Sequence, residues 1–197
     1  MDFFRDPVKR LTTDLHLNTW TTEDELIRDC RRGHRSAQKR VFDLLSPKMM
    51  ALCLRYVGDR QTAEDLLQEG FITLFSKLDS YSGTGSFEGW ARRIFVNTAL
   101  MYLRRTDALK LSDDISEARG LSSEAATPVQ NLGYKELTQL IASLPPDART
   151  VFNLHVVEGY SHKEIADMLG FTEATSRSKL QRARMRLQEL IRQQNQR

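Results

Sequence analysis

Apolar residues recur every three or four positions along most of the chain, which is the spacing of one face of a helix. The clearest case is residues 59–78, DRQTAEDLLQEGFITLFSKL, whose apolar positions form one broad stripe. A second segment, residues 86–105, combines aromatic and arginine residues at helical spacing. No segment has the apolar–polar alternation that predicts a strand. We therefore expect an all-α protein.

Short signals predict where several helices begin and end. Thr22 with Glu25, and Ser161 with Glu164, have the spacing of a capping box, in which two side chains bond the free N–H groups of a first turn. Gly170 suits the left-handed residue that ends a helix. Residues 160–187 are therefore predicted to form two helices around a tight turn. Pro47 predicts a kink or joint in the helix that contains it.

Composition divides the chain into four parts. Residues 106–133 hold five acidic and two basic residues, a balance of −3, together with a Ser–Ser pair, a proline and two glycines. This composition favours an extended, flexible acidic linker. We predict an N-terminal arm at 1–21, a small helical domain at 22–106, the linker at 107–133 and a second small helical domain at 134–197.

Bulk properties argue against several classes of protein. Cys30 and Cys53 do not form a CxxC pair, and the four histidines have no metal-ligand spacing with them, so we expect two buried thiols and no metal or cofactor. The chain has no apolar run of membrane-spanning length and no signal peptide, which predicts a cytoplasmic protein without membrane insertion. We find no phosphate-binding loop, nucleophile motif or metal constellation, so we do not expect an enzyme.

Positive charge is concentrated near the C-terminus. The net charge is only +3, but residues 173–197 carry seven basic and two acidic residues. The second helix of a helix–turn–helix enters the major groove of DNA, where arginine and glutamine pair with guanine and adenine edges. Arginine, serine and glutamine share one predicted face here, which favours DNA binding over an ordinary solvated helix. The predicted contacts are Arg177, Ser178, Gln181, Arg182, Thr175, Lys179 and Arg184.

Both halves of the chain resemble bacterial sigma factors of the extracytoplasmic-function group. The second half matches the helix–turn–helix pattern of that family at Leu144-Pro145, Arg149, Val151-Phe152, Gly159-Tyr160-Ser161, Glu164-Ile165-Ala166, Leu169-Gly170 and Arg182-Ala183-Arg184. In the first half, AEDLLQEGFITLF resembles the core-polymerase-binding helix of the family, and SFEGWARRIFVNTALMYLRR resembles its promoter-melting helix. The resemblance covers about 22–106 and 134–190. It implies two small helical domains, the second a winged-helix-like sigma domain 4.

The resemblance implies an alternative sigma factor, which binds core RNA polymerase and directs promoter-specific initiation of transcription. The helix residues named above would read the −35 duplex. The non-template strand at −10 would be captured by a glycine- and serine-rich loop and the helix after it, where Phe87 and Trp90 are expected to be core residues. The implied −10 contacts are Ser80, Tyr81, Ser82, Gly83, Thr84, Gly85, Ser86, Arg92, Arg93 and Asn97.

The resemblance also implies protein partners. A polar stripe with one isoleucine would bind the clamp helices of the largest polymerase subunit, and it consists of Asp65, Gln68, Glu69 and Ile72. The flap region of the polymerase and an anti-sigma factor are further implied partners.

Four positions depart from the family pattern. Met101 stands where aspartate is common, and Phe95 stands where a small residue is usual. Gly70 occupies a helix position that is usually larger, and Ser176 replaces an apolar residue in the recognition helix. None of them removes a predicted DNA contact.

Two other functions remain open at this stage. A stand-alone helix–turn–helix regulator would bind specific duplex DNA without polymerase. An adaptor that has kept the fold would bind a partner without directing specific initiation. The paired motifs in the two halves favour the sigma factor.

Overall fold

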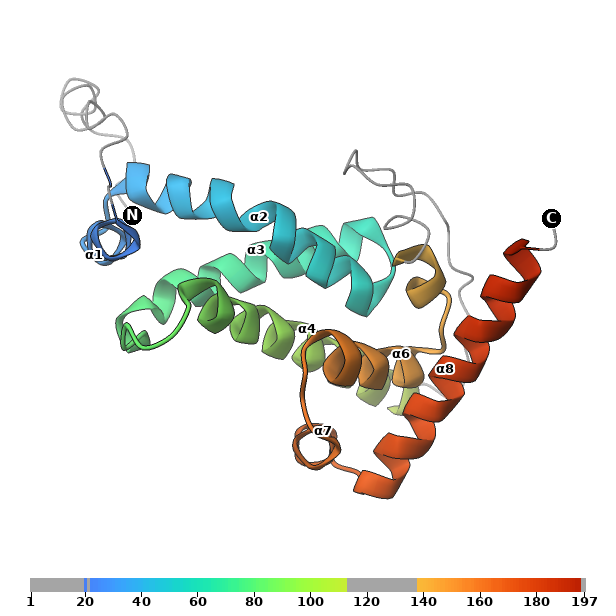
Figure 1. Cartoon of the computed structure of the whole chain (residues 1–197). Coiled ribbons are helices and arrows are strands. Elements are labelled where there is room, and N and C mark those ends of the chain that lie inside the picture. The colour runs from blue at the N-terminus through green and yellow to red at the C-terminus, as the bar shows by residue number, and fades with distance from the viewer. Residues whose placement is uncertain (1–19, 21, 113–137, 196–197) are drawn as a thin grey trace.

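The computed structural model describes residues 20, 22–112 and 138–195, and within these ranges the chain is helical with no strand (Figure 1). The predicted all-α class is confirmed, and the second domain has no β-wing among its described residues. The first domain contains α1 (Glu23–Arg31), α2 (Arg35–Val57), α3 (Arg60–Ser76), the 3-10 turn η1 (Leu78–Ser80) and α4 (Phe87–Ser112). After a short helical segment at 138–142, the second contains α6 (Pro146–Phe152), the π-helical turn η2 (Asn153–Val157), α7 (His162–Leu169) and α8 (Glu173–Asn195).

Helices α2, α3 and α4 pack together to form the core of the first domain, and α1 packs against one end of α2 (Figure 1). The predicted apolar stripe of α3 faces this core, since Ala63, Leu66 and Leu74 are fully buried. Met49 and Phe95 are also fully buried. Burial of each such side chain stabilises a domain by about 1.5–3 kcal/mol. Because this stabilisation requires the apolar face of α3 to point into the core, the stripe sets the orientation of α3 against α2 and α4.

Helix α2 passes through Pro47 without a break, so the predicted joint is wrong, whereas the alternative of a kink stays a prediction. A proline inside a helix removes one hydrogen bond and crowds the preceding turn. Leu45 and Met49, on either side of Pro47, are buried in the same core. Packing on both sides of the proline therefore outweighs its local cost.

Helix α4 extends to Ser112, beyond the predicted start of the linker at 107. Residues 107–112, DALKLS, contain no glycine or proline and include alanine, leucine and lysine, which favour helix. The helix therefore continues where acidic composition alone predicted a linker. The rest of the predicted linker, and the arm at 1–21 apart from Trp20, lie outside the described residues.

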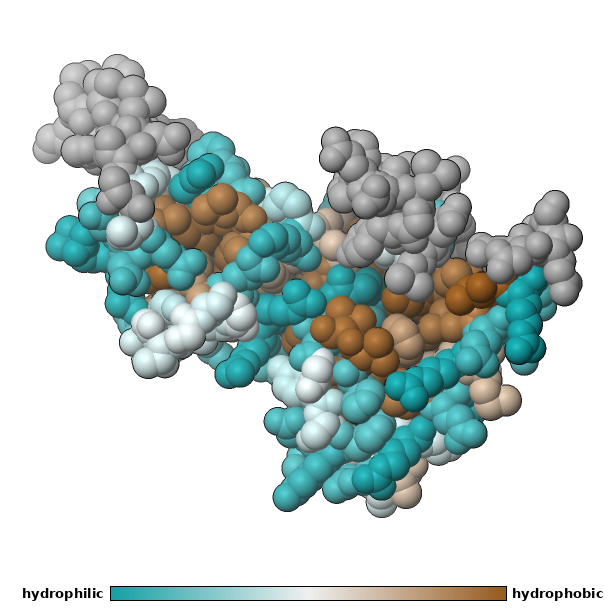
Figure 2. Space-filling view, in the orientation of Figure 1, coloured by the Kyte–Doolittle hydropathy of each residue, from teal (hydrophilic) through white to brown (hydrophobic). Residues whose placement is uncertain are grey.

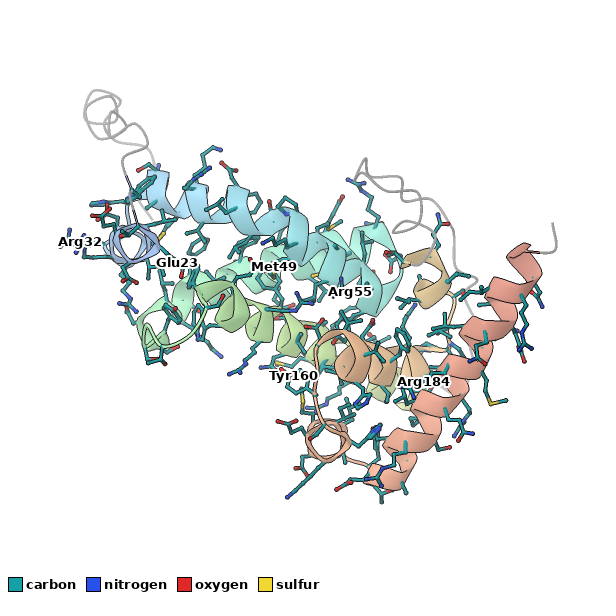
Figure 3. All side chains as sticks on the ribbon, viewed as in Figure 1. Glu23, Arg32, Met49, Arg55, Tyr160 and Arg184 are labelled. Atoms are coloured by element: carbon teal, nitrogen blue, oxygen red, sulfur yellow. The ribbon has the colours of Figure 1, made fainter. Side chains whose placement is uncertain are left out.

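The two domains pack against each other in this structure. Leu154 and Ile165 of the second domain join the same buried cluster as the first-domain core. Two hydrogen bonds reach the end of α2: Arg149 donates to the Val57 carbonyl at 3.3 Å, and Asn153 donates to the Arg55 carbonyl at 2.8 Å. Figure 3 shows Arg55 on α2, close to where α2 meets the second domain. The domains therefore share an interface that is both apolar and hydrogen-bonded.

Two of the four departures from the family pattern form a single contact. Gly70 lies on α3 and Phe95 on α4, and a Cβ atom added to Gly70 would lie 2.2 Å from the Phe95 ring. Real Cβ contacts are never that short, so the large residue at 95 depends on the missing side chain at 70. The two departures are one exchange of volume between neighbouring helices.

Candidate DNA and polymerase interfaces

Helices α7 and α8 form the predicted helix–turn–helix. The Ser161 hydroxyl accepts from the Glu164 N–H, and the Glu164 carboxylate accepts from the Ser161 N–H at 2.8 Å, so the predicted capping box is confirmed. The bond from the Ser161 N–H, and a second bond that the Ser161 hydroxyl donates to the same carboxylate at 2.7 Å, lower the pKa of Glu164. Gly170 ends α7 in the left-handed conformation with φ of 74°. Thr172 then accepts from the Thr175 N–H at 3.2 Å, which caps the first turn of α8.

One face of α8 is exposed, polar and basic. Its opposite face packs on the rest of the domain through Leu180, Ala183 and Leu187, which are buried. Figure 2 shows mainly hydrophilic residues over α7 and α8, at the lower right of the view. Figure 3 labels Arg184 on α8. The exposed members of the predicted set are Arg177, Ser178, Gln181, Arg182 and Arg184.

Internal bonds arrange part of this face before any DNA binds. Arg177 forms an exposed ion pair with Glu173 one turn earlier, at 2.7 Å. Arg182 donates weakly to the Ser178 hydroxyl at 3.4 Å. Exposed pairs of this kind contribute little stability, so a phosphate or a base edge can replace either partner at small cost.

Lys179 differs from the rest of the predicted set. Its ammonium group is bonded to the Asp147 carboxylate of α6, and its side chain is only 18% exposed. Burial opposes ionisation of Asp147, but the bonds from Lys179 and from the Ala148 N–H outweigh it and lower the Asp147 pKa. Lys179 therefore holds α6 against α8 in this structure. Thr175, at the same edge of α8, is half-buried.

The predicted −10 loop is exposed and held from within. Its residues 82–86 are all exposed, and Gly83 and Gly85 both have φ of 78°, which side-chain-bearing residues rarely adopt. In Figure 2 this loop forms the pale surface at the lower left. The Tyr81 side chain differs, because it is buried and its hydroxyl donates to the Gly85 carbonyl at 2.7 Å. Tyr81 therefore supports the loop from inside and does not present its ring to solvent.

An aromatic cluster and one arginine anchor this loop. Tyr81 contacts Phe87 and Trp90 with ring centroids 5.3 and 5.4 Å apart. Phe87 is buried, as expected, whereas Trp90 is partly buried and packs against the core. From α1, Arg31 donates to the Leu78 carbonyl at 3.3 Å and also bonds the Tyr81 carbonyl. Sequence reasoning missed Arg31, since nothing in the residues around it indicates a contact with a loop fifty positions away.

On α4, the three predicted −10 residues have different surroundings. Arg93 and Asn97 are exposed. Arg92 is bonded to the Glu158 carboxylate of the second domain, which also accepts from Arg55 at 3.1 Å. The Glu158 side chain is only 3% exposed, and its bonds raise the pKa of Arg92. The second domain therefore occupies Arg92 in this structure, a contact that the sequence analysis did not predict.

The predicted polymerase-binding stripe lies on the outer face of α3. Asp65, Gln68, Glu69 and Ile72 are all exposed. Ile72 is 71% exposed, the largest value among the exposed large apolar residues of the described chain. An isolated apolar side chain with carboxylates beside it is suited to a partner that offers an apolar pocket among basic residues.

Within the described residues, no group of three or more histidine, cysteine, aspartate or glutamate side chains could hold a metal ion. None of the helices that the structure describes is long and apolar enough to cross a membrane.

Comparison with known proteins identifies relatives of both domains. The family model for sigma-70 region 2 matches residues 41–108, and that for sigma-70 region 4 matches residues 134–187. The RNA polymerase sigma-H factor of Pseudomonas aeruginosa is 32% identical over 181 residues, which cover 84% of this chain and 92% of that protein. The ECF RNA polymerase sigma-E factor of Escherichia coli K12 is 32% identical over 176 residues, covering 83% and 91%.

A solved structure has a similar fold. It is the sigma factor RpoE in complex with the anti-sigma factor NepR from Bartonella quintana. It matches with a TM-score of 0.55 and 24% identity, covering 78% of this chain and 96% of that chain.

Proposed function

The chain belongs to the extracytoplasmic-function sigma factors, and from this premise we propose which of its residues read the promoter and contact the polymerase. It is an alternative sigma factor that binds core RNA polymerase and directs promoter-specific initiation of transcription. Sigma factors are initiation factors rather than enzymes, and we propose that this chain makes and breaks no bond itself. We also propose that it acts in the cytoplasm, where its polymerase and promoters are.

The exposed basic face of α8 carries the proposal for the −35 element. Arg182 and Gln181 are exposed and lie side by side, and their side chains suit the edges of guanine and adenine. Arg177, Ser178 and Arg184 flank them and would contact phosphates, with Thr175 at the edge of the face. Lys179 acts indirectly in this proposal, by holding α8 in place through Asp147.

For the −10 element, we propose that the exposed loop receives an unstacked base of the non-template strand. Glycines at 83 and 85 allow close approach of a base to the backbone, and the hydroxyls of Ser80, Ser82, Thr84 and Ser86 can bond its edge. Arg93 and Asn97 are exposed on α4 and would hold the neighbouring strand. Arg92 would join them once Glu158 releases it.

For the polymerase, we propose that Ile72 inserts among the clamp helices of the largest subunit. Asp65, Gln68 and Glu69 would surround that contact and pair with basic residues of the partner. The second domain would contact the flap region. An anti-sigma partner is a further proposal, supported by the complex in which the similar solved structure was determined.

The experiment that tests the function is reconstitution with bacterial core polymerase and fragments of genomic DNA, followed by mapping of RNA 5′ ends. Discrete starts that require the chain and share motifs near −35 and −10 are expected. Binding to core without specific starts would favour an adaptor. If the chain ignored core and bound duplex DNA alone, a stand-alone regulator would be favoured.

The residue assignment is tested with Arg182→Ala and the matched control Arg186→Ala. Both arginines are exposed on α8, but Arg186 lies outside the proposed contacts and pairs with Glu189 at 3.1 Å. Arg182→Ala should weaken binding to the mapped −35 duplex by about 1–3 kcal/mol, the contribution of one bidentate base contact. Equal losses on matched and scrambled duplexes would show that Arg182 touches only phosphate.

A further inference from the structure

The remaining departure in the recognition helix is a buried serine with one defined partner. Ser176 has no exposed surface, and it stands at a position where the family usually has an apolar residue. A buried hydroxyl without a hydrogen bond is destabilising. Here Nδ1 of His162, on α7, lies 2.8 Å from the Ser176 hydroxyl oxygen. The hydrogen bond therefore joins the two helices of the helix–turn–helix directly.

A second histidine supports the first. The rings of His155 and His162 are stacked, with centroids 4.3 Å apart and planes inclined by 14°. Nδ1 of His155 lies 2.9 Å from the Tyr160 carbonyl, which can only accept, so this nitrogen carries a hydrogen. That bond orients the His155 ring, and the stacked contact then restricts the rotation of His162. Residues from η2, α7 and α8 are thus connected in series.

We propose that neutral His162 is a positioning residue for promoter reading: through Ser176 it fixes the rotation of α8 that presents Gln181 and Arg182, less than two turns further along the helix, to the base edges of −35 DNA. This inference rests on the proposed reading of −35 DNA by α8. Apolar contacts at Leu180 and Ala183 hold the helix at the right distance, but they permit small rotations. A hydrogen bond is directional and restricts such rotation.

The surroundings of His162 keep it neutral. Burial lowers its pKa, and so do the stacked His155 and the guanidinium groups of Arg177 and Arg184, whereas Glu173 acts in the opposite direction. Since the folded pKa is lowered, the contribution of the neutral form is complete above the ordinary histidine pKa. It is lost as the pH falls through the lowered value. A charged His162 could only donate to the Ser176 hydroxyl, so the hydrogen bond would reverse its direction, and the charge would repel the Arg177 guanidinium on the same helix as Ser176.

The test compares three variants of the full-length chain on two duplexes, one carrying the −35 element mapped by reconstitution and one with that element scrambled. Ser176→Ala and His162→Phe each remove the hydrogen bond, and phenylalanine keeps a ring to stack on His155. His162→Asn is the conservative variant, because its side-chain amide can occupy the place of Nδ1. The readouts are affinity for each duplex from pH 5 to pH 8 and thermal stability.

The expected result is a specific effect on promoter reading. Ser176→Ala and His162→Phe should each lower affinity for the −35 duplex about 3–10-fold, the effect of one hydrogen bond, and leave affinity for the scrambled duplex unchanged. The double variant should lose no more than either single variant, because both changes remove the same bond. His162→Asn should recover most of the affinity.

The pH profile separates positioning from simple packing. The ratio of specific to scrambled affinity should fall in the native chain as the pH drops below the ordinary histidine pKa, and it should stay flat in His162→Asn, which has no titrating group at this position. Additive losses in the double variant, equal losses on both duplexes, or a pH profile unchanged by His162→Asn would each overturn the proposal. Failure of the −35 proposal itself is distinguishable, because the native chain would then bind both duplexes equally.

Discussion

Replacing Glu158 with glutamine should loosen the contact between the two domains. The carboxylate is 3% exposed and bonds Arg55, which is 9% exposed, and Arg92, which is 34% exposed. Glutamine keeps the shape and one carbonyl oxygen but removes the charge that balances the two guanidinium groups. Its effect should therefore fall on the ion cluster and spare the apolar contacts around it.

The magnitude follows from burial. Removing one member of a buried ion pair destabilises the paired state by about 3–5 kcal/mol, because a charge remains buried without a partner. Arg92 is about one-third exposed and regains water easily, so we take the lower end, about 3 kcal/mol. That corresponds to a shift of roughly 100-fold in the ratio of docked to separated domains.

The docked arrangement leaves some buried polar atoms without hydrogen-bond partners. This cost favours the separated domains, so the loss of the Glu158 charge should change the ratio of docked to separated domains measurably. Among the described residues, the buried side-chain polar atoms without a hydrogen-bond partner all lie at or beside this interface: Nε of Arg55, the hydroxyl of Tyr56, Nε of Arg149 and Oδ1 of Asn153. Any of these atoms that separation of the domains exposes would bind water again, and this favours separation. The ion cluster at Glu158 offsets these costs while the domains are docked.

The assay is a distance measurement between spin labels on cysteines introduced at two exposed positions, Ser76 on α3 and Gln188 on α8. The native Cys30 and Cys53 are buried and free, as predicted, and burial raises the pKa of each thiol to about 12. They should therefore react slowly with the label. Pulsed electron resonance then reports the distribution of distances between the domains.

The matched control is Glu189→Gln. This glutamate also pairs with an arginine of the same chain, at 3.1 Å, but both side chains are more than half exposed. The control should leave the distance distribution unchanged, whereas Glu158→Gln should broaden it toward longer distances. If Glu158→Gln kept the narrow native distribution, the carboxylate would not hold the domains together, and the reasoning from burial would be refuted.

Gly70→Ala should destabilise the first domain by about 1–3 kcal/mol in thermal melts, because its Cβ would lie 2.2 Å from the Phe95 ring. Adding Phe95→Leu to the same chain should restore most of the lost stability. Absence of this recovery would contradict the exchange of volume between the two positions. Ser161→Ala should cost about 1 kcal/mol in denaturant unfolding through loss of the helix cap, and an unchanged midpoint would argue against the cap. Ile72→Ala should lower the affinity for core polymerase about ten-fold in a fluorescence titration. The melting temperature should stay unchanged, because the side chain is 71% exposed. Full affinity would show that Ile72 is not part of the polymerase-binding stripe.

Local signals in the sequence predicted most helix boundaries, because the groups that end a helix are close together in the chain. Thr22 and Ser161 cap the helices that follow them, and Gly170 ends α7 with the predicted left-handed backbone. The end of α4 was misplaced, since acidic composition outweighed the helix preference of residues 107–112. A joint at Pro47 was wrongly predicted because the cost of the proline is local, whereas the packing that overrides it comes from other helices.

The site was predictable as a set of exposed faces but not as a set of contacts. Exposure of the α3 stripe and of most of the α8 face follows directly from helical periodicity. The burial of Tyr81 and the pairing of Arg92 do not, because each depends on partners brought together by the fold. Glu158 lies 66 residues from Arg92 and 103 from Arg55, and no spacing rule connects positions so far apart.

The contact between Gly70 and Phe95 restricts the order in which this sequence evolved from the usual pattern of its family. Phenylalanine at 95, arriving first, would have met a side chain at 70 and been removed by selection for stability. Glycine at 70, arriving first, would have opened a space that phenylalanine could then fill. Once filled, that space blocks reversal of the earlier step. Relatives should therefore show glycine alone at the first position, or both residues together, and not phenylalanine opposite a larger neighbour.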